Sequence, residues 1–178
     1  MTIELRDGEV LLRPLREEDV RVILDAEPAS DRPGHSTAEQ REEALRKRVE
    51  AQGTFVDHRI DLAIERSGKL VGTIEARRPP FGLPPGAYEL GIGLLAEQDR
   101  GQGTGTTAVR LFTEYLFSDP ETMRVQASTW VGNAAMRRVF DRLGFVFEGV
   151  MRSFMPSAER GRDDYALYAI VRSDLDAS

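Results

Sequence analysis

The 178-residue sequence contains no cysteine, two histidines, and two lysines against 22 arginines. The lack of cysteine excludes disulfides, thiolate metal sites and a cysteine nucleophile, and two histidines are too few for a histidine-rich metal centre. The net charge of −6 argues against binding a nucleic-acid backbone through bulk charge. No apolar run approaches the ~18 residues of a membrane span, and the first residues lack a signal-peptide core. These absences predict a soluble, cytoplasmic protein with no metal, no nucleic acid and no membrane partner.

Length and composition favour one domain. The 178 residues are close to the loose average of about 150 per domain, and 40% of them are hydrophobic, which is enough for a substantial core. The sequence shows no internal repeat, low-complexity tract or linker. We therefore expect residues 1–178 to form a single domain.

Hydrophobic spacing predicts an α/β protein. Strands show a two-residue period and helices show apolar residues three and four apart. The helix-capping pattern from Ser36 to Glu39 indicates the start of a polar surface helix. Residues 28–35 and the polar segment around Arg160–Arg162 are expected to be loops. The expected strands are 3–6, 10–13, 60–64, 70–76, 88–95, 124–129, 145–150 and 165–171, and the expected helices are 17–27, 37–52, 103–117 and 134–143.

The most informative segment is a glycine-rich turn at residues 99–106, between a predicted strand and a predicted amphipathic helix. Glycines let the backbone approach a ligand closely, and exposed amides with the positive end of the helix dipole form an anion site suited to phosphate. A Walker A loop is excluded because it needs a lysine that this turn lacks. A dinucleotide fingerprint is excluded because Thr106 stands where it needs glycine. A glycine-rich turn without a ligand remains the alternative.

Two blocks of sequence resemble the GCN5-related N-acetyltransferase (GNAT) superfamily. Arg100, Gly103 and Gly105 fill its acetyl-CoA pattern, [Arg/Gln]-x-x-Gly-x-[Gly/Ala]. A second block of the sequence resembles the RimJ/RimL branch, which acts on ribosomal-protein N-termini. It consists of Asn133-Ala134-Ala135-Met136, Leu143-Gly144-Phe145 and Glu148-Gly149. The same branch is resembled near the start of the chain by Leu12-Arg13-Pro14-Leu15 with Glu18-Asp19. The resemblance covers nearly the whole chain in the right order.

The resemblance implies a GNAT fold and a coenzyme site. The fold would be a twisted, mostly antiparallel sheet of about six to seven strands with splayed central strands, flanked by about four helices. Acetyl-CoA, or another acyl-CoA, would be the co-substrate. Its diphosphate would lie on the glycine-rich turn, its pantetheine would pair with the backbone of Leu94 and Leu95, and Asn133 would face it near the thiol. The turn residues concerned are Arg100, Gly101, Gln102, Gly103, Thr104, Gly105 and Thr106. Asn133 is equally suited to cap the following helix.

Acyl transfer to an amine requires a base, because an alkylamine of pKa ~10.4 is almost fully protonated at pH 7. Glu89 is the first candidate. It shares a strand face with Gly91 and Gly93, and two glycines beside a carboxylate leave room for a substrate. A solvated glutamate beside a strand bulge is the alternative interpretation. Glu75 is the second candidate.

The thiolate leaving group lacks the acid that relatives often supply. Phe140 occupies the position of their tyrosine and lies on an apolar stripe, so we expect it to be core. Tyr165, Tyr168 and Ser128 are substitutes, although core positions suit both tyrosines better. Water can also protonate a thiolate, because the thiol pKa is near ~8.5. Trp130 is expected to pack at a strand end or line the acceptor pocket, and His35 and His58 are expected at the surface.

The leading hypothesis is an N-acyltransferase that moves an acetyl group from acetyl-CoA to a primary amine, either a protein N-terminus or a small molecule. The catalytic residues would be Glu89 and Asn133, and the protein would be a monomer or homodimer. The alternatives are a weakly active or inactive acyl-CoA-binding module, which the phenylalanine at position 140 motivates, and an interaction protein without a cofactor.

Overall fold

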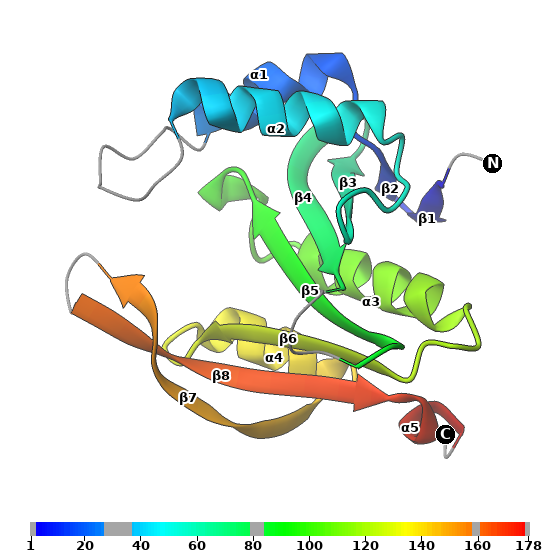
Figure 1. Cartoon of the computed structure of the whole chain (residues 1–178), viewed down its shortest axis with the longest axis vertical. Coiled ribbons are helices and arrows are strands. Elements are labelled where there is room, and N and C mark those ends of the chain that lie inside the picture. The colour runs from blue at the N-terminus through cyan, green and yellow to red at the C-terminus, as the bar shows by residue number, and fades with distance from the viewer. Residues whose placement is uncertain (1–2, 27–36, 79–83, 158–160, 177–178) are drawn as a thin grey trace. The chain divides into compact units, whose positions relative to one another are not determined.

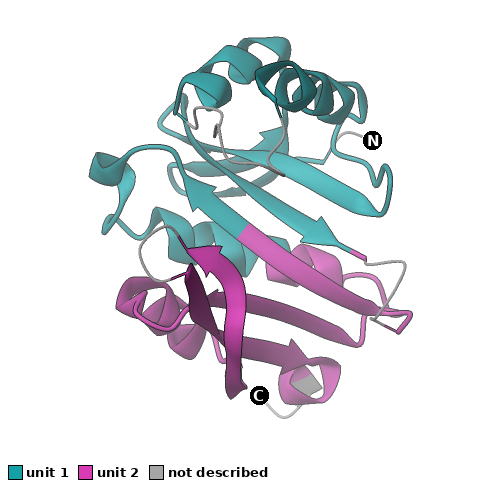
Figure 2. Ribbon diagram, turned by 60° about the vertical axis from the view of Figure 1, so that its left-hand side comes forward, with its two compact units in different colours: residues 1–77, 92–112 teal, residues 78–91, 113–178 magenta. Residues whose placement is uncertain are grey.

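The computed structural model describes residues 3–26, 37–78, 84–157 and 161–176. The chain divides into two compact units, residues 1–77 with 92–112 (unit 1) and residues 78–91 with 113–178 (unit 2), coloured teal and magenta in Figure 2. The expectation of a single domain over residues 1–178 stays a prediction. His35 and Ser36 lie outside the described residues.

The strands form one mixed sheet in the order β1-β2-β3-β4-β5-β6-β8-β7. The pairs β1–β2, β2–β3, β3–β4, β6–β8 and β7–β8 are antiparallel, and β5–β6 is parallel. Over the described residues the sheet has eight strands, as many as the hydrophobic spacing predicted and more than the six to seven that the family resemblance implied. The strands are β1 (Leu5–Asp7), β2 (Val10–Pro14), β3 (Arg59–Arg66), β4 (Lys69–Arg77), β5 (Ala87–Leu94), β6 (Arg124–Trp130), β7 (Val146–Ser157) and β8 (Gly161–Val171).

The four expected helices are present, and a short fifth one follows the last strand. They are α1 (Glu17–Ala26), α2 (Ala38–Glu50), α3 (Thr104–Phe117), α4 (Ala134–Arg142) and α5 (Arg172–Asp176), with a 3₁₀ turn, η1 (Glu97–Asp99). The capping box of α2 lies one residue later than predicted: Thr37 Oγ1 accepts from the Gln40 amide at 3.2 Å, and Gln40 Oε1 accepts from the Thr37 amide at 2.9 Å. None of the described helices combines the length and apolarity needed to cross a membrane.

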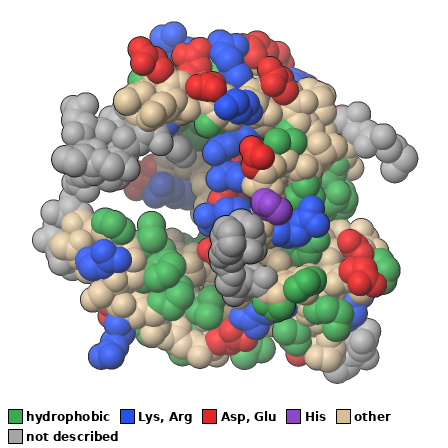
Figure 3. Space-filling view, viewed as in Figure 1, with side chains coloured by type: hydrophobic (Ala, Val, Ile, Leu, Met, Phe, Trp, Pro, Cys, Tyr) green, Lys and Arg blue, Asp and Glu red, His purple; other side chains and the backbone are tan. Residues whose placement is uncertain are grey.

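In unit 1, α1 and α2 lie side by side (Figure 1). They share a buried apolar cluster of Leu15, Val20, Ile23, Leu45 and Ala63. The only buried side chain of α2 is Leu45, as its thin apolar stripe predicted. Charged side chains of both signs cover the outer face of the two helices, at the top of Figure 3. α2 is therefore a surface helix whose polar face is stabilised by ion pairs such as Arg46–Glu42 at 2.8 Å.

In unit 2, the hairpin of β7 and β8 extends further than the sequence predicted. Residues 151–157 and 161–164 are strand, where we expected a polar loop. Arg162 explains the extension, because its guanidinium donates to the carbonyls of Ser153 at 2.5 Å and Phe154 at 2.7 Å. The Ser153 amide in turn donates to Asp164 Oδ1 at 2.7 Å. Side-chain hydrogen bonds thus replace the apolar alternation that normally marks a strand in sequence.

An ion pair joins β6 to β7 in this unit. Arg124 donates to both carboxylate oxygens of Glu148, at 2.7 and 2.5 Å. These hydrogen bonds lower the pKa of Glu148 from its ordinary 4.5. A carboxylate whose pKa is lowered by folding stabilises the protein above its unfolded pKa, and this contribution disappears as the pH falls through the folded pKa.

Replacing Glu148 with Gln is therefore expected to have a pH-dependent effect. The Glu148 side chain is 35% exposed, so the loss of stability at pH 7 should be below about 1 kcal/mol. The difference from wild type should shrink as the pH falls below the ordinary glutamate pKa of 4.5 and through the lowered pKa of Glu148. Urea denaturation at several pH values measures it, and a difference that does not change with pH would contradict the assigned role of the pair.

Candidate active site

The glycine-rich turn lies between η1 and α3 in unit 1. Gly101 has φ +72° and Gly103 has φ +80°, a backbone region that favours glycine. The Gly103 carbonyl accepts the first helical hydrogen bond, from the Thr107 amide at 3.0 Å. Gly103 is therefore the N-cap of α3, which starts at Thr104, one residue later than predicted.

This turn has the geometry of an anion site. The first amides of a helix have no intrahelical acceptor, and α3 carries no acidic residue in its first turn. A Cβ atom built on Gly101, Gly103 or Gly105 would meet no atom within 4 Å. The space beside the backbone is therefore open, and the positive end of the helix dipole favours a negatively charged group there.

The end of β5, which includes Leu94, is held close to β4 in the same unit. The Leu95 amide donates to the Val71 carbonyl at 2.9 Å. A Cβ on Gly72 would collide with the Gly93 carbonyl oxygen, so glycine at position 72 permits the close approach. A Cβ on Gly93 would meet nothing within 4 Å. The strand end is thus fixed on one side and open beside Gly93.

Glu89 lies on β5 within unit 2 and is half-buried. Its neighbours Tyr88 and Leu90 are buried, as the predicted alternation requires. The parallel ladder pairs Glu89 with Gln126 and ends at Leu90, although both strands continue. Glu89 therefore lies one residue before the end of the β5–β6 ladder.

Glu75, the second candidate base, is engaged in ion pairs within unit 1. Its carboxylate pairs with Arg59 and, at 3.3 Å, with Arg77. Arg59 also donates to the buried Asp61 at 2.6 Å. Burial lowers the pKa of the Arg59 guanidinium, an effect that the charge of Asp61 opposes. These contacts give the Glu75 carboxylate a structural role in a network of ion pairs.

Asn133 is the N-cap of α4, in unit 2. Its Oδ1 accepts from the Met136 amide at 3.1 Å, and its Nδ2 donates to the buried Thr129 Oγ1 at 3.1 Å. The capping interpretation is confirmed. Nearby, the indole of Trp130 covers Gly132 and is 38% exposed, so Trp130 packs at the strand end while keeping an open face.

Comparison with known proteins identifies the family. The model of the acetyltransferase (GNAT) domain matches residues 9–146, which is most of the chain. The chain belongs to the GNAT family of acetyltransferases. The expected family and fold class are thereby confirmed, apart from the extra strand and the extra helix.

Solved GNAT structures share the fold over almost the whole chain. The ribosomal-protein-S5-alanine acetyltransferase of Vibrio fischeri superimposes with a TM-score of 0.77 at 19% identity, covering 97% of this chain and 98% of that one. RimJ of Mycobacterium smegmatis, in complex with CoA-disulfide, gives a TM-score of 0.72 at 22% identity, covering 97% and 88%.

A curated relative matches over a shorter segment. A kanamycin resistance protein of Rhizobium radiobacter is 31% identical over 67 residues. The match spans 38% of this chain and 62% of that protein.

Phe140, which stands where GNAT relatives often have a tyrosine, belongs to the core of unit 2. Phe140 is 1% exposed, and its ring centroid lies 5.4 Å from that of Phe145 and 5.2 Å from that of Tyr168. The expectation that Phe140 is core is confirmed. Tyr168 is equally buried, and its hydroxyl accepts from Arg137 Nε at 3.1 Å. This hydroxyl is therefore already hydrogen-bonded.

The remaining candidate side chains lie on different strands and turns. Ser128 and Tyr165 are half-buried on β6 and β8, and the Tyr165 ring packs on Phe154 with centroids 5.7 Å apart. The expectation of a core position holds for Tyr168 but not for Tyr165. His58 is exposed in a turn. Among the described side chains, no group of three or more His, Asp or Glu could hold a metal ion.

One side chain beside the glycine-rich turn escaped prediction. Arg66, at the end of β3, donates to Gln102 Oε1 at 2.5 Å. Thirty-six positions separate the two residues, and no periodicity or motif relates them. Only the folded chain brings them together.

Proposed function

We propose that this GNAT protein transfers an acetyl group from acetyl-CoA to a primary amine. The observation that carries the proposal is the open, positively polarised turn at the start of α3, in a chain of this family. The amides of residues 101–106 would bind the diphosphate, since the Arg100 amide already donates to the Glu97 carbonyl at 3.0 Å. Because the Leu95 amide is engaged with Val71, pantetheine would pair with the Leu95 carbonyl and with the backbone of Leu94.

The reaction must take two protons from the ammonium nitrogen and release one leaving group. Glu89 accepts a proton from the ammonium, directly or through water, and the neutral nitrogen attacks the thioester carbonyl. The nitrogen of the tetrahedral intermediate loses its second proton to solvent, the C–S bond breaks, and CoA leaves as a thiolate. Solvent protonates the thiolate, which is a tolerable leaving group because the thiol pKa is about 8.5. Asn133 would contact the coenzyme near its sulfur while it caps α4.

The acceptor is an amine, and the names of similar proteins suggest which amines to test. Two of the similar proteins are named for ribosomal-protein acetylation or RimJ, and one for kanamycin resistance. We propose a protein N-terminus first and an amino sugar second. Thiol release from acetyl-CoA, measured with N-terminal peptides of ribosomal proteins, kanamycin and a polyamine, tests the proposal. Turnover above hydrolysis with at least one amine is the expected result.

Gly103 offers a direct test of the coenzyme site. Replacement with Val places a branched side chain in the open space beside the turn and strains a backbone at φ +80°. We expect the Kd for CoA, measured by calorimetry, to rise at least about tenfold, a loss of about 1.4 kcal/mol.

Gly144→Val is the matched control. Gly144 has φ +79° and equally open surroundings, but it follows α4. Both variants should lose similar stability, about 1–3 kcal/mol of backbone strain. Equal losses of CoA affinity in the two variants would contradict the diphosphate site.

The burial of Phe140 favours a second candidate, an acyl-CoA-binding module with little or no catalysis. A positioned acid contributes roughly 10²–10⁴-fold to a rate, and phenylalanine cannot supply it. This candidate predicts CoA binding in calorimetry and no thiol release with any amine of the panel. Turnover that requires an amine excludes it.

A further inference from the structure

Arg66 lies against the glycine-rich turn, and both belong to unit 1. Its Nη1 donates to Gln102 Oε1 at 2.5 Å and approaches the Gln102 carbonyl at 3.4 Å and Thr104 Oγ1 at 3.3 Å. Thr104 is the first residue of α3 and is 2% exposed. One guanidinium nitrogen thus contacts both the turn and the first residue of the helix.

The backbone of β3 sets this position. β3 stays in regular register with β2 through its last residue, Arg66, which pairs with Val10. The irregularity in the ladder between β3 and β4 lies on β4, where Val71 is the extra residue. β3 then ends in a turn in which Ser67 has φ +49° and Gly68 has φ +80°. The Ser67 amide donates to the Glu9 carbonyl at 3.0 Å, which ties this turn to the start of β2.

Further hydrogen bonds hold both Arg66 and Gln102 in place. Glu9 Oε2 accepts from Nε and Nη2 of Arg66, at 3.3 and 3.2 Å. Gln102 Nε2 donates to the Gln98 carbonyl in η1 at 2.7 Å. The Gln102 side chain therefore bridges η1 and Arg66, and its own orientation is fixed from both sides.

We propose that Arg66 is a positioning residue for the coenzyme turn. By holding Gln102 and Thr104, it keeps the turn in one conformation before the ligand arrives, so the amides of residues 101–106 already face the diphosphate. A turn ordered in advance loses less conformational entropy on binding. The role belongs to the planar guanidinium fork, because a lysine ammonium carries the charge but cannot reach Glu9 and Gln102 in the same way. This inference rests on the proposed function.

The experiment compares Arg66→Gln, Arg66→Lys, Gln102→Ala and the double variant Arg66→Gln/Gln102→Ala. In the protein without ligand, hydrogen exchange of the two hydrogen-bonded amides that flank the turn, Arg100 (to the Glu97 carbonyl) and Thr107 (to the Gly103 carbonyl), should accelerate at least threefold in each variant. The Kd for CoA should rise about three- to tenfold, and the KM for acetyl-CoA should rise with it while kcat changes less than twofold. The double variant should lose no more than the worse single variant, because the two residues act through one contact.

Arg21→Gln is the charge-matched control. It removes one arginine from an exposed pair on α1, with 84% of the Arg21 side chain accessible. Exchange of these two amides and the Kd for CoA should stay at their wild-type values. Additive losses in the double variant, or wild-type exchange and affinity in Arg66→Lys, would overturn the positioning role.

The exchange measurement separates this inference from the proposed function. If wild type binds no CoA, the proposed function fails, whatever the exchange rates are. If wild type binds CoA and Arg66→Gln leaves exchange and Kd unchanged, only the role of Arg66 fails.

Discussion

Glu89→Gln is expected to lower kcat for acetyl transfer by about 10²–10⁴-fold, the usual contribution of a positioned general base. The amide keeps the size of the side chain on β5 but cannot accept the proton from the ammonium. The KM for acetyl-CoA should change little, because the diphosphate is expected to bind at the glycine-rich turn. Steady-state thiol release, with the best amine of the panel varied at saturating acetyl-CoA, measures the effect.

Glu75→Gln distinguishes the two candidate bases. Its ion pairs with Arg59 and Arg77 give Glu75 a structural role, so this variant should keep kcat within about threefold of wild type. A large loss of kcat in Glu75→Gln, together with normal turnover in Glu89→Gln, would transfer the assignment to Glu75. A loss in neither variant would indicate that water alone removes the proton.

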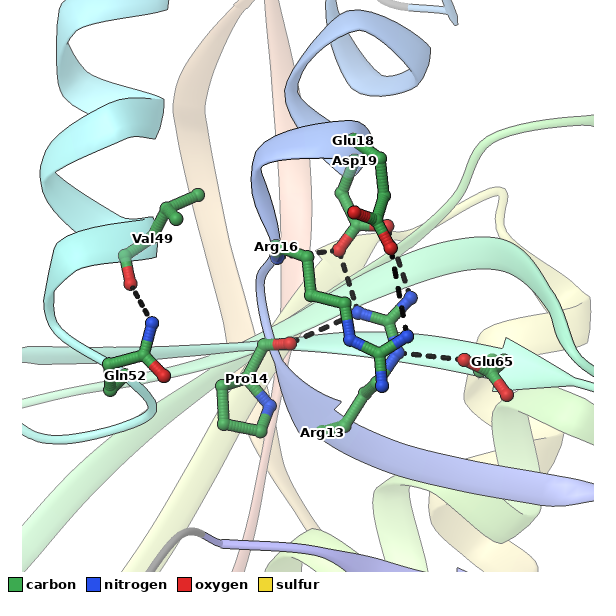
Figure 4. Close-up of polar contacts among 8 residues, drawn as sticks. All are labelled: Arg13, Pro14, Arg16, Glu18, Asp19, Val49, Gln52 and Glu65. Atoms are coloured by element: carbon green, nitrogen blue, oxygen red, sulfur yellow. Dashed lines mark hydrogen bonds and ion pairs between the residues drawn. The ribbon is translucent and has the colours of Figure 1, made fainter.

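The largest effect on stability is expected from Asp19→Ala in unit 1. Figure 4 shows Arg13 between Asp19 and Glu65, with bidentate hydrogen bonds of 2.7 and 3.1 Å to Asp19 and one of 2.7 Å to Glu65. Asp19 also accepts from the Arg16 amide at 2.8 Å. Arg13 and Asp19 are each 3% exposed, and the hydrogen bonds that Arg13 donates to Asp19 raise the pKa of the Arg13 guanidinium.

Removing Asp19 leaves the buried guanidinium without its main partner, which typically destabilises a protein by about 3–5 kcal/mol. Urea denaturation measures the change. Asp25→Ala is the matched control, since it removes an aspartate of the same helix whose pair with Arg21 is exposed, and it should cost below about 1 kcal/mol. Similar losses in the two variants would show that burial of the Arg13 network contributes little.

The sequence predicted the elements whose signals are local. Leu62, Ile64 and Ile74 follow a two-residue period, and all three are fully buried in β3 and β4. The intervening Asp61 and Ala63 are buried as well, so β3 is buried on both faces and not on one as the period predicted. The glycine-rich turn was predicted for the same reason, because its glycines, the preceding strand and the following helix are adjacent in sequence. Asn133 as a helix cap also follows from its immediate neighbours.

The features that were missed depend on partners distant in sequence. Arg13 is buried because Asp19 and Glu65 neutralise it, and Glu65 lies 52 positions away. Polar residues such as Arg162 extend the β7–β8 hairpin through contacts with backbone carbonyls, which leave no hydrophobic period. Contacts of this kind require the fold to be known first.

The division of the chain has a consequence for protein engineering. The backbone passes from one unit to the other between residues 77 and 78, 91 and 92, and 112 and 113, so that β5 and α3 each contribute to both units. A chimera made with a single crossover can therefore never exchange one complete unit for that of a homologue. Such an exchange needs three junctions, two of them inside continuous secondary structure, where flanking sequences from both parents must be compatible.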